Sequence, residues 1–77
     1  MSTTHLFNND RYVETWNGLS SSLEHANTIH TLIEARGRAE GYALGLFDAG
    51  VISPAQRQEL LTMVNVSAAQ RAKVLRA

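Results

Sequence analysis

The sequence predicts an all-α fold, and three observations lead to this prediction. Helix-capping residues are frequent, apolar residues recur at the helical spacing of three and four, and no stretch shows the sustained alternation of apolar and polar residues that marks a strand. The length of 77 residues suits a single domain. We therefore expect one helical domain over residues 1–77, with a flexible N-terminus over residues 1–8. The expected order is a long N-terminal helical segment, a tight turn and two short helices, in a dimeric helical bundle.

The first helical segment is predicted to begin after "NND" (Asn8–Asp10), whose side chains can cap a helix. An apolar seam with a 3-4-3-4 spacing follows, and its members are Trp16, Leu19, Leu23, Ala26, His30 and Ile33. The seam runs through Asn17–Gly18, where the helix could break, and Ser21 with Glu24 could restart it as a capping box. One long helix and two abutting helices therefore both remain open over residues 10–49.

The tight turn is predicted to follow the first segment at Gly50. This glycine is placed as the left-handed residue that ends a helix, with Val51 able to fold back on Leu46. "SPAQ" at 53–56 predicts the start of the next helix, because it combines a serine cap, a proline in the first turn and a glutamine three residues after the serine. "SAAQ" at 67–70 repeats the pattern and predicts the start of a second short helix.

Composition and charge exclude several classes of protein. The chain has no cysteine, so neither a disulfide nor a cysteine zinc site supports its core. Seven basic and seven acidic residues cancel, so no overall field attracts nucleic acid or a membrane. The first 35 residues carry four acids against one arginine, and the last eleven carry three cations and no acid, which could steer two copies head to tail. No apolar run approaches the roughly 20 residues of a membrane span, and the N-terminus lacks a secretory apolar region, so we expect a cytoplasmic location and no membrane partner.

Three glycines fall four residues apart inside the first segment, namely Gly37, Gly41 and Gly45. Each costs about 1 kcal/mol relative to alanine in a helix interior. Residues four apart share a helix face, so the glycines form a shallow groove that a second helix can approach closely. The occupant could be the chain's own helix over 54–64, or a helix of a second copy or of another protein. A kink or hinge at the glycines is the remaining alternative.

The helix that carries these glycines is apolar on nearly every side, and such a helix is normally buried on more than one face. A 77-residue monomer can hardly bury all of it, so we expect a homodimer. The predicted packing and dimer residues are Gly37, Gly41, Gly45, Tyr42, Leu46 and Phe47. Tyr12 and Trp16 are candidate partner-binding residues, because aromatic side chains dominate interface energetics. A place in the core is the alternative for both aromatic residues.

No group of residues predicts catalysis or metal binding. His30 and Glu34 form an i, i+4 pair, but a metal site needs three or four convergent ligands. The serines at 20–22 have no oriented base beside them. The glycines lie inside a helix, and not in the strand-to-helix turn that binds phosphate. We therefore predict no enzymatic activity, no cofactor and no metal site.

A helix-turn-helix DNA-binding unit is the alternative reading of residues 54–76. "ELLTMVNVSAAQRAKVLRA" (59–77) resembles a repressor-type unit, with Asn65 in the turn and Val66 buried. The resemblance implies that the nucleic-acid contacts are Ser67, Gln70, Arg71, Lys73 and Arg76. Arg71 departs from the family pattern, which usually places a branched apolar residue there. A cationic C-terminal helix favoured by its own dipole explains the same charges.

Two resemblances bear on function. "LGLFDAGVISPAQRQELLTMV" (44–64) is similar to the short helical hairpin of the SHOCT type. The whole chain resembles the small all-helical accessory proteins of mobile genetic elements such as phages and plasmids, many of which bind and block a host defence complex or transcription regulator. The resemblance implies a non-enzymatic protein-interaction module, a small regulator or inhibitor of another protein. The DNA-binding regulator is the alternative.

Overall fold

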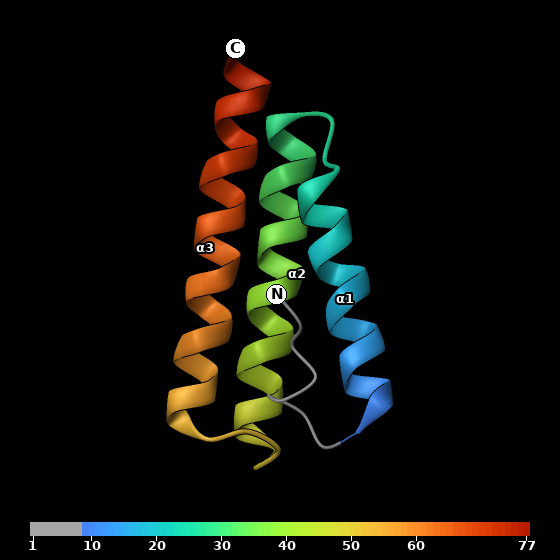
Figure 1. Ribbon diagram of the computed structural model, residues 1–77, viewed down its shortest axis with the longest axis vertical. Coiled ribbons are helices and arrows are strands. Elements are labelled where there is room, and N and C mark those ends of the chain that lie inside the picture. The colour runs from blue at the N-terminus through green and yellow to red at the C-terminus, as the bar shows by residue number, and fades with distance from the viewer. Residues whose placement is uncertain (1–8) are drawn as a thin grey trace.

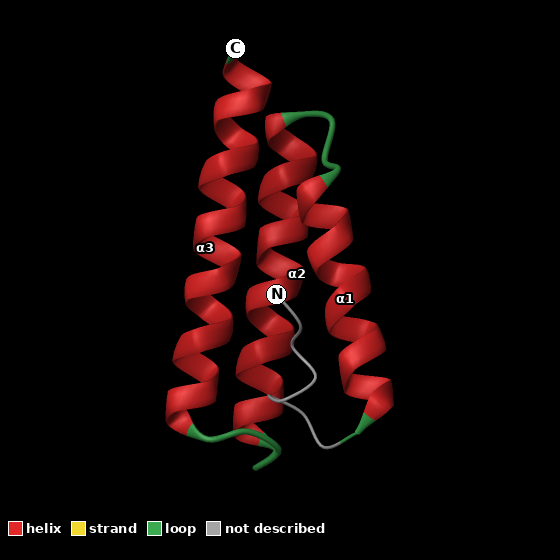
Figure 2. Ribbon diagram, in the orientation of Figure 1, coloured by secondary structure: helices red, strands yellow, loops and turns green. Residues whose placement is uncertain are grey.

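This computed structural model describes residues 9–77, which form three helices joined by two short connections. They are α1 (Asp10–Glu24), α2 (Ile29–Asp48) and α3 (Pro54–Arg76), and they run up, down and up beside one another (Figure 1, Figure 2). Each helix packs against both others in a bundle with extents of 38 × 19 × 17 Å. The all-α prediction is confirmed for these residues, whereas the flexible N-terminus predicted over 1–8 lies outside them. None of the described helices has the length and apolar character needed to cross a membrane.

Of the two alternatives left open over residues 10–49, one long helix is wrong and two helices are found, because the chain turns at residues 25–28. α1 ends at Glu24, and Thr28 begins α2 from an extended backbone conformation. The Thr28 hydroxyl accepts a hydrogen bond from the Thr31 N–H at 3.0 Å, and the Thr31 hydroxyl accepts one from the Thr28 N–H at 3.1 Å. These reciprocal bonds satisfy N–H groups that the start of a helix leaves unpaired. Asn17–Gly18, the predicted break, lies inside α1, and so does the capping box predicted to follow it.

The prediction of two short helices after the turn is also wrong, because α3 is one continuous helix. The "SAAQ" sequence at 67–70 lies inside α3 and starts nothing. Neither glycine nor proline occurs between Ala55 and Arg76, so nothing interrupts the backbone hydrogen bonds. Val64 and Ala68, one turn apart, are both buried, so one face of α3 continues to pack across the expected break.

The connection between α2 and α3 is short and depends on one glycine. Gly50 has a φ of 77°, a left-handed conformation that costs other residues about 1–2 kcal/mol. The Val51 N–H then donates to the Leu46 carbonyl oxygen at 2.9 Å, which closes the end of α2. The Ser53 hydroxyl accepts from the Gln56 N–H at 3.1 Å, and the Ser53 N–H donates to the Gln56 side-chain oxygen at 2.7 Å. This capping box starts α3 antiparallel to α2.

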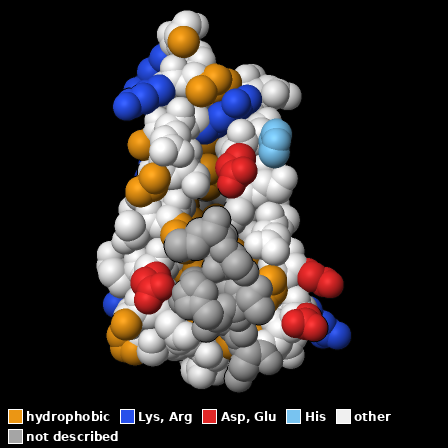
Figure 3. Space-filling model, in the orientation of Figure 1, with side chains coloured by type: hydrophobic (Ala, Val, Ile, Leu, Met, Phe, Trp, Pro, Cys, Tyr) orange, Lys and Arg blue, Asp and Glu red, His pale blue; other side chains and the backbone are white. Residues whose placement is uncertain are grey.

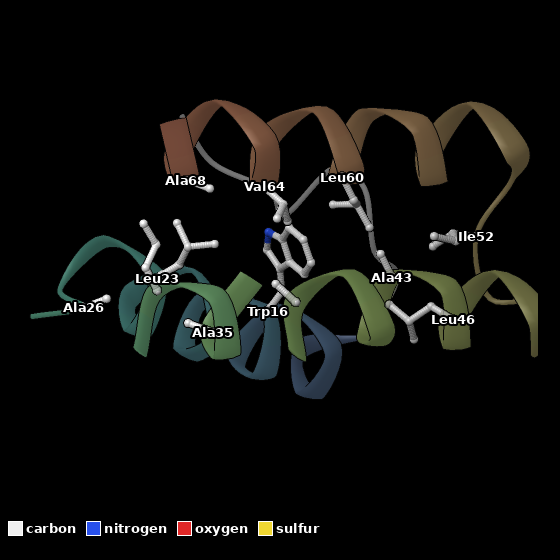
Figure 4. Packing of buried hydrophobic residues seen from close by; sticks show 12 residues of the cluster. Trp16, Leu23, Ala26, Ala35, Ala43, Leu46, Ile52, Leu60, Val64 and Ala68 are labelled. Atoms are coloured by element: carbon white, nitrogen blue, oxygen red, sulfur yellow. The ribbon is translucent and has the colours of Figure 1, made fainter. Parts of the chain in front are cut away.

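The core lies along the axis of the bundle and draws on all three helices (Figure 4). Its largest fully buried side chains are Trp16, Leu23 and Leu60. α2 contributes mainly small side chains four residues apart, which we call the alanine stripe: Ala35, Ala39 and Ala43. Short side chains at this contact let the other helices approach α2 closely. The close-packed face of α2 is therefore built from alanine and not from glycine.

Candidate protein-interaction surface

The glycines of α2 lie on the side of the helix that faces away from the core. Gly37, Gly41 and Gly45 are exposed, and a Cβ added to any of them would meet no described heavy atom within 4 Å apart from its chain neighbours and the backbone of its own helix. The prediction that the chain's own helix over 54–64 fills this groove is therefore wrong. Leu60 of that helix is instead fully buried on the alanine side of α2 (Figure 4). Alanine methyl groups add buried apolar area that glycine cannot supply, which favours this choice of face.

Two large apolar side chains flank the uncovered glycines. Ile33 is 62% exposed and Leu44 is 45% exposed. At about 3.6 residues per turn, both lie on the same side of α2 as Gly37 and Gly41. We call this surface the outer face of α2. Its middle consists of Ile33, Gly37, Gly41 and Leu44, and its two polar ends are His30 and Asp48. Exposed branched side chains beside bare backbone form a surface that another helix can bury.

Charged side chains lie on and beside the outer face. His30 Nε2 lies 3.5 Å from a carboxylate oxygen of Glu34, an ion pair only when the imidazole is protonated. Arg36 Nε lies 3.4 Å from a carboxylate oxygen of Glu40. Surface pairs of this kind contribute about 0–1 kcal/mol to stability. The fold therefore depends little on these charges, and a partner can use them.

A second apolar surface is the groove between the first half of α2 and the second half of α3, which encloses about 570 Å³. Its apolar lining residues are Ile29, Leu32, Ile33, Ala68, Ala69 and Ala72. Its other lining residues are three cations and one amide: Arg36, Lys73, Arg76 and Asn65. Figure 3 shows Lys and Arg side chains near the end of the molecule where α3 ends. We call this surface the α2–α3 groove.

The α2–α3 groove was not predicted, because the sequence reasoning placed Ile33 on a continuous buried seam. The turn at residues 25–28 interrupts that seam and changes the helical register. Leu32 and Ala35 then face the core, while His30 and Ile33 face outward. The sign of a second apolar surface that the sequence does carry is the spacing of Ile29 and Ile33, which lie one turn apart.

The larger side chains predicted to pack beside the glycines lie elsewhere on α2. Leu46 is buried in the core, and Tyr42 and Phe47 are half-buried against it. The guanidinium carbon of Arg57 lies 4.4 Å from the centre of the Phe47 ring, so Phe47 belongs to the contact between α2 and α3. These three residues stabilise the bundle itself. The predicted packing set therefore does not form one surface.

The two aromatic residues predicted to bind a partner pack within the chain. Trp16 is 1% exposed, and its indole Nε1–H has no hydrogen-bond partner among the described residues. A pocket of about 210 Å³ lies beside it between α1 and α3. Tyr12 is half-buried against the core. Trp16 therefore occupies the core, which was the alternative to partner binding, and it is not exposed to a partner.

The helix-turn-helix predicted over 54–76 is absent, because α3 contains no turn. Val66, expected to be buried, is 52% exposed. Arg71 Nε donates to the Ala26 carbonyl oxygen at 2.8 Å, so this side chain contacts the turn between α1 and α2. Of the other predicted nucleic-acid contacts, Ser67 is half-buried. Gln70, Lys73 and Arg76 are exposed.

Comparison with protein-family models, with curated proteins and with solved structures finds no match to this chain. Among residues 9–77, no three His, Cys, Asp or Glu residues are grouped so that they could hold a metal ion. The outer face of α2 and the α2–α3 groove are therefore the candidate functional surfaces.

Proposed function

We propose that this protein is a non-enzymatic helical interaction module, a small regulator or inhibitor that binds another protein and pairs with a second copy of itself. The observation that carries the proposal is that Gly37 and Gly41 are uncovered between the exposed Ile33 and Leu44. Each glycine lowers helix stability by about 1 kcal/mol relative to alanine, and no side-chain contact among the described residues offsets this cost. A second helix that crosses at the glycines would offset it through dispersion contacts between closely approaching backbones.

The outer face is complementary to itself when two copies of α2 run antiparallel. Its residues are placed almost symmetrically about the middle of the helix. A two-fold axis there brings Gly37 of one copy opposite Gly41 of the other, and Ile33 opposite Leu44. The apolar side chains then cover one another. The glycines let the two helix axes approach below the roughly 8–10 Å that is usual for packed helices.

The charged residues favour the same orientation. Antiparallel pairing brings His30 of one copy towards Asp48 of the other, and Arg36 towards Glu40 of the other. Parallel pairing would instead place Asp48 near its own counterpart and would leave Arg36 of one copy and Glu40 of the other on opposite sides of the contact. Like charges repel and unlike charges attract, so the antiparallel arrangement is favoured.

The role as a regulator or inhibitor is supported by the resemblance to small accessory proteins that block a host protein. A protein that acts by covering a surface of its partner needs no catalytic residue. Pairing would also present two copies of every remaining surface, so a partner with two sites would bind with increased avidity.

Sedimentation equilibrium over about 1–100 μM protein tests the pairing. We expect a reversible equilibrium between monomer and dimer. Gly41→Leu places a large side chain at the crossing and should give a folded monomer at every concentration. Gly18→Leu is the matched control, because Gly18 is an exposed glycine inside α1 that also has nothing within 4 Å of an added Cβ. A wild-type protein that stays monomeric, or a Gly41→Leu dimer as stable as the wild type, would contradict the proposal.

A further inference from the structure

We infer that the α2–α3 groove is a docking site for an acidic amphipathic helix of another protein. The inference rests on the proposed function and deepens it, because it identifies the class of partner. Most of the residues that carry it belong to α3, which the pairing of α2 does not use: Ala69, Ala72, Lys73 and Arg76.

The groove occupies the place of a fourth helix in a bundle. α1 packs against both α2 and α3, but no residue of α1 lines the groove. Leu32 and Ala68 in the groove are buried, whereas Ile29 and Ile33 beside them are exposed. Two antiparallel helices with an apolar floor between them accept a further helix, as four-helix bundles do. The shape and the apolar floor therefore favour a helix as the occupant.

The α3 side of the groove is built from small residues. Ala68, Ala69 and Ala72 leave room for the backbone of an incoming helix to approach α3 closely. Ile29 of α2, which the pairing does not cover, can then pack between side chains of that helix. The volume of about 570 Å³ is ample for a row of apolar side chains. An incoming helix would fill it with apolar residues spaced by three and four.

Charge around the groove selects the partner. Arg36, Lys73 and Arg76 line it, and none of the described lining residues is acidic. Arg36 is engaged by Glu40 at 3.4 Å, so Lys73 and Arg76 supply most of the uncompensated charge. Asp or Glu on the flanks of an incoming helix would be attracted, and Lys or Arg would be repelled. Duplex DNA is also anionic, but its phosphates do not cover the apolar floor.

A second copy of this chain is a poor occupant, because the groove requires a helix that has both an accessible apolar face and acidic flanks. Its acidic helix is α1, which carries Asp10, Glu14 and Glu24. The large hydrophobic side chains that are exposed within residues 9–77 all belong to α2 or α3. α2 of a second copy has exposed apolar side chains and three acids, Glu34, Glu40 and Asp48, but Arg36 and Arg38 offset two of them. Its outer face is also the surface that the proposed pairing covers, so the occupant comes from another protein.

Selection from a library of displayed helical peptides tests the inference. The probe is a helix of about 20 residues, randomised on one face and on the flanks of that face, and selected for binding to the wild-type protein. We expect the enriched peptides to combine an apolar stripe with Asp or Glu on its flanks. Lys73→Glu combined with Arg76→Glu should weaken their binding by at least about tenfold. Lys73→Gln with Arg76→Gln, which disturbs the end of α3 less, should weaken it in the same direction.

Ala69→Glu is the groove-blocking variant, because Ala69 lines the groove and is exposed enough to accept a larger side chain. It should lower the affinity of the enriched peptides by at least about tenfold. Val66→Glu is the matched control, since Val66 is exposed on α3 and does not line the groove. Arg38→Glu is the control for charge reversal outside the groove. Both controls should leave the affinity within about twofold of the wild type.

Several outcomes would overturn the inference. They are enrichment of basic or uncharged peptides, no enrichment over an unrelated protein, and unchanged affinity for Ala69→Glu. Steeply salt-dependent binding of a duplex of about 20 base pairs, lost on reversal of Lys73 and Arg76 and accompanied by no peptide enrichment, would assign the groove to nucleic acid instead. The monomeric Gly41→Leu variant should still bind the enriched peptides, so failure of the groove and failure of the pairing are distinguishable.

Discussion

The Arg71 Nε–H donates a hydrogen bond to the carbonyl oxygen of Ala26 at 2.8 Å, although 45 positions separate the two residues. The contact is partly buried and joins the second half of α3 to the turn between α1 and α2. It requires a long side chain with a planar head, which arginine alone supplies. Arg71 therefore fixes the turn against α3, which explains an arginine where a recognition helix would bury an apolar residue.

Replacement of Arg71 should lower stability. Arg71→Ala removes a hydrogen bond from a charged donor and should lower the free energy of unfolding by about 1.5–3 kcal/mol. Arg71→Lys should recover only part of this loss, because its ammonium group does not reproduce the Nε geometry. Urea denaturation followed by circular dichroism measures both. Lys73→Ala, an exposed neighbour, is the control and should change stability by no more than about 0.5 kcal/mol. Equal stability of Arg71→Ala and Lys73→Ala would mean that the contact is not structural.

Trp16 should act through the core and not through a partner. Trp16→Ala should lower the free energy of unfolding by about 3–5 kcal/mol, because it empties the largest buried site. Trp16→Phe should cost less, since the ring fills much of the volume and removes an indole N–H that has no partner in residues 9–77. Urea denaturation measures the difference, and the single tryptophan of the wild type should show blue-shifted emission in the folded state. A Trp16→Ala variant as stable as the wild type would place Trp16 outside the core.

The outer glycines should be a weakness of the isolated monomer. Gly37→Ala should raise the free energy of unfolding by about 1 kcal/mol at protein concentrations too low for pairing, because nothing lies near the added methyl group. Gly18→Ala in α1 should raise it by a similar amount and serves as the matched control. Thermal unfolding at increasing dilution measures both effects. If Gly37→Ala destabilised the dilute protein, a contact on the outer face within one chain would be indicated.

A larger side chain in the alanine stripe should destabilise the protein, in contrast to one at the outer glycines. Ala39 is fully buried, and Ala39→Leu forces extra volume into the contact of α2 with its neighbours. We expect a loss of at least about 1–3 kcal/mol in the free energy of unfolding. Gly37→Leu, on the opposite side of the same helix, should leave the dilute monomer at least as stable as the wild type. A reversed order of these two variants in urea denaturation would contradict the assignment of the two faces.

The helical class and the start of α3 follow from local chemistry. Ser53, Pro54 and Gln56 form a cap that works wherever the chain has just left a helix at a left-handed glycine. The same pattern at 67–70 does not start a new helix, because no residue before it ends α3. Thr28 was missed as a cap because its reciprocal partner is Thr31 and not the usual Glu or Gln.

The choice between the two small-residue faces of α2 required the tertiary structure. Alanines at 35, 39 and 43 precede the glycines at 37, 41 and 45 by two residues, which places them roughly 200° apart around the helix. Spacing alone does not say which face is buried. Leu32 and Leu46 lie on the alanine side, and burial of these large side chains decides the orientation. The three glycines do share one face of α2, but the prediction that the chain's own helix covers that face is wrong.

Disulfide trapping tests the antiparallel pairing of α2 most directly. The natural chain has no cysteine, so Ile33→Cys and Leu44→Cys each carry a single thiol. Antiparallel pairing brings position 33 of one copy opposite position 44 of the other. It separates the two copies of position 33 by roughly 16 Å along the axis at about 1.5 Å per residue, whereas a disulfide needs Cα atoms within about 7 Å.

An equimolar mixture of the two variants should therefore give the mixed disulfide as its main oxidised product, and each variant alone should give little. Mass spectrometry of the oxidised mixture identifies the species, with Val66→Cys replacing Leu44→Cys as the measure of random collision. A mixed product no more abundant than in this control, or a homodisulfide from Ile33→Cys alone that predominates, would contradict the account.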